Sequence, residues 1–384
     1  MTDPDPVRSL AVLTTGRQDW GVLRSTCVAI RDETDVRLDV VAGGTHRSAA
    51  HGMTINGIRE DGFEPSELAW IPGDERATTE ASIALRAVGN HLRATSPDAL
   101  LLVGDRYETA AAALAATLER VPIAHLHGGE QTLGAFDDQL RHAITKLAHL
   151  HLVSSEANGR RVLAMGEDPG SVHVVGAPGL DNAFRPDLPD RASLAADLGF
   201  ALEPPVVIVT VHPATLDADL AGAALAVAAA MDAVPATYVV FVPNVDPGAD
   251  AVAATMLAAA DGPRRLSVRA LGERRYWGLM RVADAMLGNS SSGVIEAPAA
   301  GLPVVNVGDR QAGRDRAPNV IDVPADPDAV ADALRRALAP GFREGLEAAP
   351  GEGPDGRAGA RVAHIIAAWR PPRPPRKPAI RVPA

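Results

Sequence analysis

The sequence predicts an α/β protein of two domains, each built on a parallel β-sheet. Three observations indicate this class. The chain has 384 residues, which is more than one hydrophobic core ordinarily serves. Short apolar runs alternate with helical patterns along both halves, as in βαβ units. The run Leu100–Val103 is apolar without interruption, which is typical of a strand buried on both faces of a parallel sheet.

The composition is that of an ordinary globular protein and argues against several classes of partner. Hydrophobic residues make up 46% of the chain and charged residues 22%. The formal net charge of −11 argues against a nucleic-acid partner, because a phosphate backbone requires a basic surface. Cys27 is the single cysteine, which fits a reducing compartment. No apolar stretch is long enough to span a bilayer and the start is acidic, so we expect a cytoplasmic protein without a membrane partner.

The first domain is expected over residues 1–182. It opens with a strand at Leu10–Thr14, followed by a polar turn that holds Arg17. This turn has no GxGxxG pattern, so a nicotinamide cofactor is not indicated. A second strand, over residues 36–44, ends close to His46. That edge is where open α/β sheets bind ligands, although a solvated loop histidine explains the local pattern equally well.

Polar side chains follow the next two predicted strands. Asp105 and Arg106 come directly after the uninterrupted apolar run, while His127 and Glu130 follow a strand at residues 122–126. An acidic residue at a helix start beside a surface cation would be the simplest explanation of the first pair. Because neighbouring parallel strands end at the same edge, however, both pairs are expected to lie together there.

A helix is predicted to begin near Asp137. Its apolar positions recur at helical spacing, so one face is core. Asp137 lies four residues before Arg141, and an ordinary i,i+4 ion pair is one interpretation. The functional interpretation places Asp137 at the helix start, beside the carboxylates of the preceding strands. The following strand, residues 149–153, carries His151.

The second half repeats the alternation of strands and helices. We expect an interdomain region over residues 183–204 and a second domain over residues 205–370. The strand Val206–Val211 of this domain ends at His212. Residues 371–384 contain prolines too frequent for a helix or a sheet, which predicts a polyproline-like or disordered tail in solvent.

The segment MLGNSSSGVIEAP, residues 286–298, predicts a phosphate site. A strand, a turn of small residues and a helix start would present backbone N–H groups and hydroxyls to an anion. An ordinary serine N-cap is the alternative. Glu296, about one turn into the helix, could reach sugar hydroxyls, which favours a nucleotide sugar. The residues expected to bind this ligand from the second half are Tyr276, Asn289, Ser290, Ser291, Ser292, Gly293, Glu296, Arg310 and Arg314.

Several separated segments together resemble one family. They are GDRYE at 104–108, HLHGGE at 125–130, DDQLRHAITKLAHLHLVSSE at 137–156, VGAPGLDN at 175–182, VHP at 211–213, GNSSSGVIEAP at 288–298 and VNVGDRQAGR at 305–314. In this order they resemble the UDP-N-acetylglucosamine 2-epimerases, above all the hydrolysing enzymes of sialic and legionaminic acid pathways. The resemblance covers residues 8–370.

This resemblance implies two Rossmann-like domains facing across a cleft, similar to B-type glycosyltransferases. It also implies that UDP-N-acetylglucosamine, or a 2,4-diacetamido-trideoxy relative, loses UDP to give a glycal, which water converts into a free N-acetylmannosamine-type sugar. A base, an acid–base group and a stabilised diphosphate are then required. The implied partner is a nucleotide sugar, the implied assembly a homodimer or homotetramer, and neither cofactor nor metal is called for. The implied catalytic residues are Asp105, Glu130, Asp137 and His212, and the implied substrate-binding residues in the first domain are Arg17, His46, Arg106, His127 and His151.

Three departures from the family pattern leave alternatives open. Many relatives have a glutamate where this chain has His127, so either Glu130 or His127 takes that role. Their HPET is HPAT here, with Ala214 in place of a carboxylate, and Trp20 replaces a tyrosine. The alternatives are a non-hydrolysing 2-epimerase, a B-type glycosyltransferase and a nucleotide-sugar sensor that has lost catalysis. A glycosyltransferase would not require the clustered carboxylates.

Overall fold

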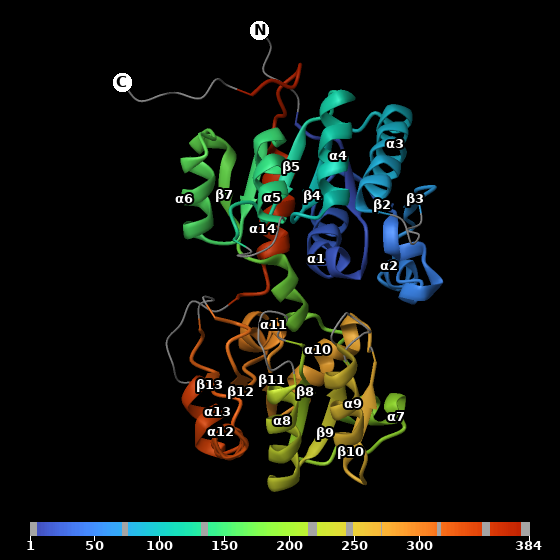
Figure 1. The fold of residues 1–384 in the computed structure, drawn as a ribbon. Helices are drawn as coiled ribbons and strands as arrows, with labels where there is room; N and C mark the ends of the chain where they lie inside the picture. Colours follow the sequence, from blue (N-terminus) through green and yellow to red (C-terminus); the bar gives the residue numbers. More distant parts are fainter. Residues whose placement is uncertain are drawn as a thin grey trace. The chain divides into compact units, whose positions relative to one another are not determined.

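The chain folds into two compact units, each a parallel sheet covered by helices (Figure 1). The computed structural model describes residues 6–70, 76–131, 137–213, 221–242, 249–269, 271–312, 316–347 and 354–377. Unit 1 comprises Met1–Asn182 and Pro354–Ala384, and unit 2 comprises Ala183–Gly353. The predicted α/β class with two parallel sheets is confirmed. Among the described helices, none combines the length and the apolar character that crossing a membrane requires.

The seven strands of unit 1 pair in the order β3-β2-β1-β4-β5-β6-β7, and each pair is parallel. The chain moves outward from β1 to β3, then returns to the other side of β1 at β4. The crevice beyond the carboxyl ends of β1 and β4 is therefore a topological switch point, where such sheets bind ligands. The strands are β1 Ser9–Thr14, β2 Arg37–Ala42, β3 Ser66–Glu67, β4 Ala99–Val103, β5 Ile123–Leu126, β6 Leu150–Val153 and β7 Val172–Val174.

Helices cover both faces of this sheet, with one buried apolar cluster on each side. One cluster lies under α1 and α14, and the other under α3 and α4. The helices are α1 Arg17–Glu33, α2 Ile55–Glu60, α3 Ala77–Thr95, α4 Tyr107–Leu118, α5 Asp137–Leu147, α6 Glu156–Ala164 and α14 Ala358–Ala368, with short 3₁₀ turns η1 Gly44–Arg47, η2 Ala49–His51, η3 Pro169–Ser171 and η4 Pro178–Phe184.

The last helix, α14, belongs to unit 1, which corrects the expectation that the second domain runs to residue 370. Its side chains Val362 and Ile366 are fully buried in the cluster under α1. Asp181 accepts hydrogen bonds from the first backbone N–H groups of α14, including that of Gly359 at 2.7 Å. A Cβ atom at Gly359 would lie 2.5 Å from Oγ of Ser25, so glycine is what allows α14 to approach α1 this closely.

The sheet of unit 2 has six parallel strands in the order β10-β9-β8-β11-β12-β13, with its switch point between β8 and β11. The strands are β8 Val206–Thr210, β9 Thr237–Phe241, β10 Arg265–Val268, β11 Ala285–Gly288, β12 Val304–Val307 and β13 Val320–Val323. The helices are α7 Arg191–Leu198, α8 Gly222–Ala233, α9 Ala249–Ala259, α10 Glu273–Val282, α11 Ser291–Ile295, α12 Pro327–Ala337 and α13 Pro340–Glu347, with the 3₁₀ turn η5 Ala297–Ala300.

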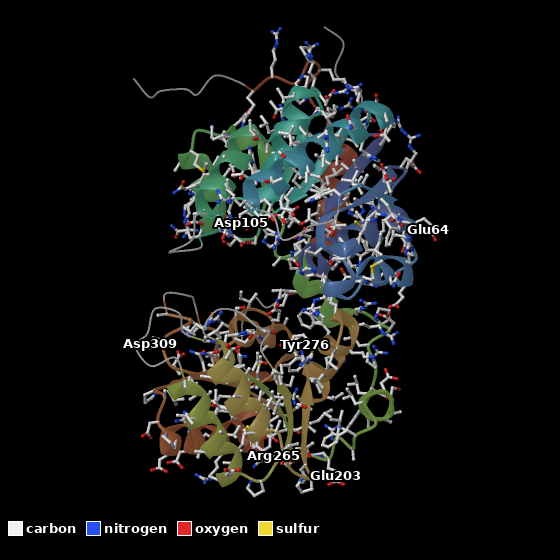
Figure 2. The ribbon with its side chains drawn as sticks, turned by 45° about the vertical axis from the view of Figure 1, so that its right-hand side comes forward. Glu64, Asp105, Glu203, Arg265, Tyr276 and Asp309 are labelled. Atoms are coloured by element: carbon white, nitrogen blue, oxygen red, sulfur yellow. The ribbon has the colours of Figure 1, made fainter. Side chains whose placement is uncertain are left out.

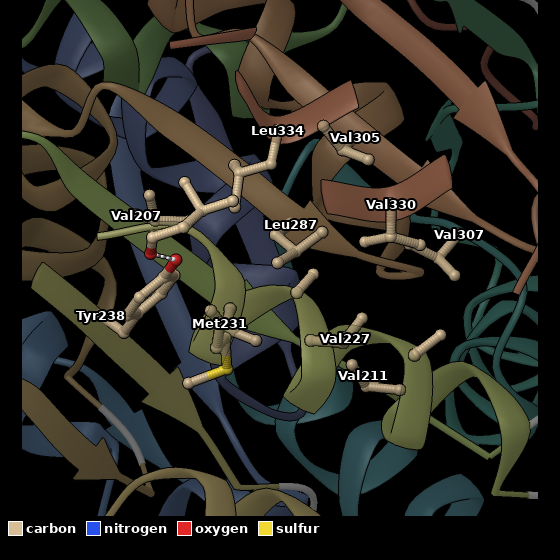
Figure 3. Packing of buried hydrophobic residues seen from close by; sticks show 14 of the residues in the cluster. Val207, Val211, Val227, Met231, Tyr238, Leu287, Val305, Val307, Val330 and Leu334 are labelled. Carbon is tan, nitrogen blue, oxygen red and sulfur yellow. Dashed lines mark hydrogen bonds between the residues drawn. The ribbon is translucent and has the colours of Figure 1, made fainter. Parts of the chain in front are cut away.

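Buried aliphatic side chains from the strands and from α8 and α12 form the core of unit 2 (Figure 3). Tyr238 is buried there, and its hydroxyl donates a hydrogen bond of 2.6 Å to the carbonyl oxygen of Val234. Residues 183–204, expected as an interdomain region, are part of unit 2 instead. Their helix α7 is fixed to α10 because Arg191 donates a 2.7 Å hydrogen bond to the carbonyl oxygen of Val282.

Candidate functional site

The carboxyl edge of the unit 1 sheet carries an ion pair whose carboxylate follows β4. Asp105, labelled in Figure 2, forms an ion pair with Arg141 of α5, whose guanidinium is almost fully buried. Arg141 also lies 3.7 Å from Asp138. The ion pair with Asp105 holds α5 against the end of β4, while the positive charge of Arg141 also acts on Asp137. Arg106 pairs instead with the buried Glu108, at 2.6 Å.

The end of β5 places an imidazole and a carboxylate in direct contact. His127 has a φ of +65°, a left-handed conformation that is costly for a residue with a side chain and concentrates at functional sites. Its Nδ1 lies 2.5 Å from Oε1 of Glu130, which also accepts a 2.7 Å hydrogen bond from Ser154. Within the described ranges, the buried Nε2 of His127 has no hydrogen-bond partner.

The carboxylates at this edge differ in protonation behaviour. Burial raises the pKa of Glu130, but the charge of His127 and the hydrogen bonds from His127 and Ser154 outweigh it and hold that pKa at about 2. Burial and the negative charge of Asp105 instead raise the pKa of Asp137, the first residue of α5. Asp137 is therefore the stronger base of the two.

His125 joins the end of β4 to α5. It is fully buried, its Nε2 lies 2.8 Å from the carbonyl oxygen of Gly104, and its Nδ1 lies 3.2 Å from the hydroxyl of Thr145. Burial lowers the pKa of His125 to about 3, so the ring is neutral at physiological pH. Through these two contacts the neutral ring connects the end of β4 to α5.

His46 and His151, interpreted from the sequence as substrate-binding groups, are fully buried in the structure. Both nitrogens of His46 are occupied, by the hydroxyls of Thr14 at 2.8 Å and Thr54 at 2.9 Å, so His46 fixes a loop rather than presenting itself to a ligand. Burial lowers its pKa to about 4. The ring of His151 comes from within β6 and its Nε2 meets Glu167 at 3.0 Å, below the carboxyl edge.

Arg17 is exposed and is the first residue of α1, directly after the turn that follows β1. Beside it, Asp19 is buried and accepts hydrogen bonds from the backbone N–H of Thr15 at 2.8 Å and from its hydroxyl at 2.6 Å. Burial raises the pKa of Asp19, while the hydrogen bonds from Thr15 and the positive charge of Arg106 oppose this. A cation and a buried carboxylate thus stand at the switch point between β1 and β4.

In unit 2 the side chain of Asn289 connects the ends of β8 and β11. Its Oδ1 accepts a 2.7 Å hydrogen bond from the backbone N–H of His212, and its Nδ2 donates one of 2.9 Å to the carbonyl oxygen of His212. Gly288 precedes it with a φ of +135°, and a Cβ atom there would lie 2.0 Å from the carbonyl oxygen of Thr210. Only glycine allows the two strand ends to approach this closely.

The serine turn follows Asn289 and leads into α11. Ser290 caps α11, because its Oγ accepts a hydrogen bond from the backbone N–H of Ser292. The hydroxyls of Ser292 and Tyr276 lie 2.7 Å apart, and the ring of Tyr276 (Figure 2) packs edge-on against Phe241. Because α11 spans only Ser291–Ile295, Glu296 is its C-cap rather than a residue inside it.

Two side chains from the loop after β12 reach the same turn. Arg310 and Gln311 both donate to the carbonyl oxygen of Asn289, at 3.1 and 2.9 Å. Gly293 packs against Val304, as a Cβ atom on it would lie 2.9 Å from Cγ1 of that valine. Arg314 and Ala214, which were singled out from the sequence, lie outside the described residues.

Sequence reasoning missed several residues of these clusters. Asp19 and Ser154 follow predicted strands closely, and that position was a signal for them. No sequence signal pointed to Gln311, because an amide side chain in a loop belongs to no distinctive pattern. Within the described ranges, no group of three or more His, Cys, Asp or Glu side chains is arranged to hold a metal ion.

Two Rossmann-like units with polar clusters at their switch points define a protein of the class that binds ligands beyond the carboxyl ends of parallel strands. The family described as UDP-N-acetylglucosamine 2-epimerase matches residues 28–367. The chain therefore belongs to the UDP-N-acetylglucosamine 2-epimerase family, which confirms the resemblance.

Individual relatives agree with this assignment. A UDP-N,N'-diacetylbacillosamine 2-epimerase (hydrolyzing) of Legionella pneumophila is 35% identical over 342 residues, which cover 86% of this chain and 89% of the relative. A GDP/UDP-N,N'-diacetylbacillosamine 2-epimerase (hydrolyzing) of Campylobacter jejuni is 30% identical over 322 residues, covering 82% and 84%. The crystal structure of UDP-GlcNAc 2-epimerase from Neisseria meningitidis bound to UDP-GlcNAc shares the fold, with a TM-score of 0.72, 15% identity and coverage of 93% of this chain and 98% of that one.

Proposed function

We propose that this protein is a hydrolysing 2-epimerase of a UDP-linked 2-acetamido sugar. The substrate would be UDP-N-acetylglucosamine or its 2,4-diacetamido-trideoxy relative, and the products UDP and the free 2-epimer. The names of the Legionella and Campylobacter relatives support the hydrolysing branch and the diacetamido sugar. The observation that carries the proposal is the gathering, at one sheet edge, of carboxylates in unlike environments: Asp105 paired with Arg141, Glu130 paired with His127, and Asp137 with a raised pKa.

Unit 2 would hold the UDP. The serine turn offers hydroxyls and backbone N–H groups to the diphosphate, and His212, Arg310 and Arg314 of the same unit would supply further donors. Tyr276 would orient Ser292 through the hydroxyl contact. By stabilising the charge on the departing diphosphate, these groups would lower the barrier to breaking the bond from C1 of the sugar to oxygen.

Unit 1 would supply the proton-transfer groups. A base removes the proton from C2, the electron pair of that bond becomes the C1–C2 double bond of a glycal, and UDP departs with the electrons of the C1–O bond. Asp137 suits the base because burial and Asp105 raise its pKa. Water then adds its hydroxyl to C1 while C2 receives a proton on the opposite face. His127, held by Glu130, suits that delivery.

Proton NMR of the full chain in deuterated water tests the reaction. With each of the two nucleotide sugars, we expect free UDP and a free 2-epimer that carries deuterium at C2. Accumulation of the UDP-linked 2-epimer would show a non-hydrolysing enzyme instead. If neither sugar reacted, the proposed function would be refuted, and transfer to an acceptor or simple binding would be tested next.

Substitutions test the residue roles. Asp105→Asn, Glu130→Gln and Asp137→Asn are each expected to lower kcat by about 100-fold or more, the usual contribution of a positioned acid or base. Glu156→Gln is the matched control, because Glu156 is an exposed carboxylate at a neighbouring helix start of the same edge. Near-normal turnover by all three variants would refute the carboxylate scheme.

A further inference from the structure

The chain after α14 runs across the amino-terminal edge of the unit 1 sheet, opposite the edge that carries Asp105. The carbonyl oxygen of Trp369 accepts a 3.1 Å hydrogen bond from Val7. Arg373 forms an ion pair with Asp98, which also accepts a 2.9 Å hydrogen bond from the backbone N–H of Ser9 at the start of β1. These contacts correct the expectation of a solvated tail over residues 371–377; residues 378–384 lie outside the described ranges. In Figure 1 the segment directly after α14, drawn in red, lies on this side of unit 1.

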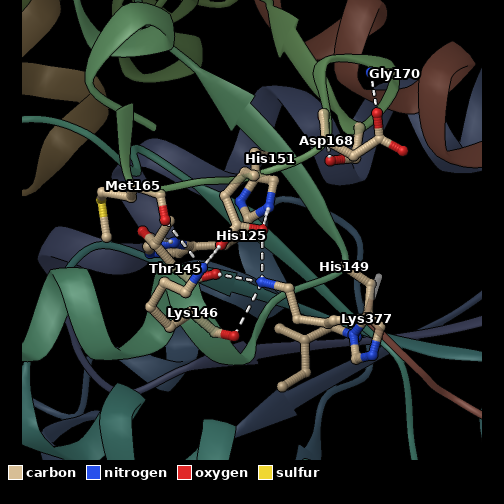
Figure 4. A network of polar contacts seen from close by, with 12 residues as sticks. His125, Thr145, Lys146, His149, His151, Met165, Asp168, Gly170 and Lys377 are labelled. Atoms are coloured by element: carbon tan, nitrogen blue, oxygen red, sulfur yellow. Dashed lines mark hydrogen bonds and ion pairs between the residues drawn. The ribbon is translucent and has the colours of Figure 1, made fainter. Parts of the chain in front are cut away.

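Lys377 anchors this tail at the end of α5 (Figure 4). Its Nζ donates to the carbonyl oxygens of Thr145 at 3.2 Å and Lys146 at 2.9 Å, both in the last turn of α5. The last carbonyl groups of a helix have no partner within the helix, and the negative end of the helix dipole attracts a cation. The ammonium group therefore caps α5 from outside the helix.

The same ammonium group completes a buried ion cluster. Glu167, whose side chain is only 3% exposed, lies 2.6 Å from Nζ of Lys377, 2.6 Å from Nζ of Lys146 and 3.0 Å from Nε2 of His151. Burial raises the pKa of Glu167, yet these donors hold it at about 2. A buried carboxylate that loses a cationic partner is left strongly unfavourable. Lys377 is thus a half-buried partner of a buried carboxylate.

Helix α5 links this cluster to the proposed reaction edge. Its last turn contacts Lys377, Thr145 contacts His125, and Arg141 pairs with Asp105. Its first residue is Asp137, about 12–14 Å along the helix from Thr145 and Lys146, because an α-helix rises 1.5 Å per residue. A shift at the capped end therefore moves the proposed base at the other end.

We propose that residues 371–377 form a strap and that Lys377 is a positioning residue: by capping α5 and completing the Glu167 cluster, it fixes where α5 presents Asp137. The kinetic part of this inference rests on the proposed function. The structural part, the coupling of the tail to α5, does not. Lys377 touches neither substrate nor reacting atoms, and it acts through α5.

The test compares three variants of the full chain. Lys377→Gln removes the charge and keeps a polar stem, Lys377→Arg keeps a charged donor, and Arg376→Gln removes the same charge from an exposed neighbour in the tail. Hydrogen–deuterium exchange is followed in the peptide that covers residues 137–147. We expect this peptide to exchange faster in Lys377→Gln than in the wild-type protein, and at the wild-type rate in Arg376→Gln. In Lys377→Arg the rate should return at least part of the way to that of the wild-type protein.

Kinetics with the nucleotide sugar that the wild-type protein turns over provide the second readout. We expect Lys377→Gln to lower kcat by about 3- to 10-fold with KM changed less than twofold, because small misplacements of a catalytic group cost rate while the nucleotide site lies in unit 2. A purely structural role would lower the unfolding temperature and leave kcat unchanged. Should Lys377→Gln not fold, the double variant with Glu167→Gln, which removes the buried charge together with its partner, is measured instead.

The outcomes separate the two proposals. If the wild-type protein turns over neither sugar, the proposed function fails, and exchange in α5 alone decides the inference. Equal exchange in Lys377→Gln and Arg376→Gln would overturn the strap whatever the activity. Faster exchange with an unchanged kcat would overturn the positioning role.

Discussion

Replacing Gly288 with alanine is expected to disorganise the carboxyl edge of the unit 2 sheet. The added Cβ atom would lie 2.0 Å from the carbonyl oxygen of Thr210 on the neighbouring strand, so the ends of β8 and β11 must part by roughly 1 Å. That carbonyl accepts the 3.1 Å hydrogen bond from the backbone N–H of Asn289. Separation would break this bond and strain both bonds between Asn289 and His212.

The magnitude follows from these contacts. A φ of +135° is suited to glycine, and forcing another residue into such a conformation costs about 1–3 kcal/mol. Each lost hydrogen bond costs about 1 kcal/mol. We therefore expect unit 2 to lose about 3–5 kcal/mol, whereas Gly308→Ala, with a φ of +75° and no atom within 4 Å of the added Cβ, should lose only about 1 kcal/mol.

Differential scanning calorimetry and a UDP titration measure the effect. For a unit of this size, 1 kcal/mol corresponds to about 2–4 °C, so the transition of unit 2 should fall by roughly 6–20 °C in Gly288→Ala and by about 2–4 °C in Gly308→Ala. UDP affinity should fall in Gly288→Ala because the serine turn follows Asn289 directly. Equal transitions in the two variants, with UDP binding intact, would refute the argument.

Three further predictions concern single side chains. Tyr276→Phe removes the hydroxyl contact with Ser292 but keeps the ring on Phe241, and should weaken UDP binding by about 3- to 10-fold in titration calorimetry. Glu167→Gln should cost on the order of 3 kcal/mol near pH 7. The folded pKa of Glu167, about 2, lies below its ordinary value of 4.5, so the stability that its charge contributes is complete above pH 4.5 and is lost towards pH 2. The difference in unfolding midpoint between the variant and the wild-type protein therefore shrinks over that window. Cys27 is fully buried, and burial raises its pKa, so a thiol reagent should label the native protein about 100-fold more slowly than the unfolded one.

The first two of these predictions each have a matched comparison variant, and the third has an outcome that would contradict it. Tyr238→Phe also deletes a bonded hydroxyl, but in the core, and should lower the unfolding temperature without changing UDP affinity. Glu156→Gln changes an exposed carboxylate, so its unfolding midpoint should stay close to that of the wild-type protein from pH 7 to pH 2. Labelling of native Cys27 at the unfolded rate would contradict its burial under α14.

The sheets were predictable from the sequence because each strand is indicated by the residues within it. An uninterrupted apolar run such as β4 has one stable environment, the centre of a parallel sheet, and a residue just after it must lie at the carboxyl edge. The placement of α14 was not predictable in the same way. The spacing of Val362 and Ile366 shows that one face is buried, but it does not show which sheet covers that face. The deciding contacts, such as Asp181 with Gly359, join residues far apart in the chain.

The same contrast between local patterns and contacts of distant residues decides what could be predicted of the site. Sequence position brought Asp105, Glu130 and Asp137 to one edge, yet the chemistry of each depends on its partner. Arg141 lies 36 residues from Asp105, and the Glu167 cluster that backs α5 is closed by Lys377 from a tail whose composition favours solvent. Because a partner can shift a carboxyl pKa in either direction by more than its sequence neighbours do, acid and base roles follow only once the pairs are known. In this protein cations hold Asp105 and Glu167, whereas the pKa of Asp137 is raised by burial and by Asp105. That difference is the reason we propose Asp137 as the base.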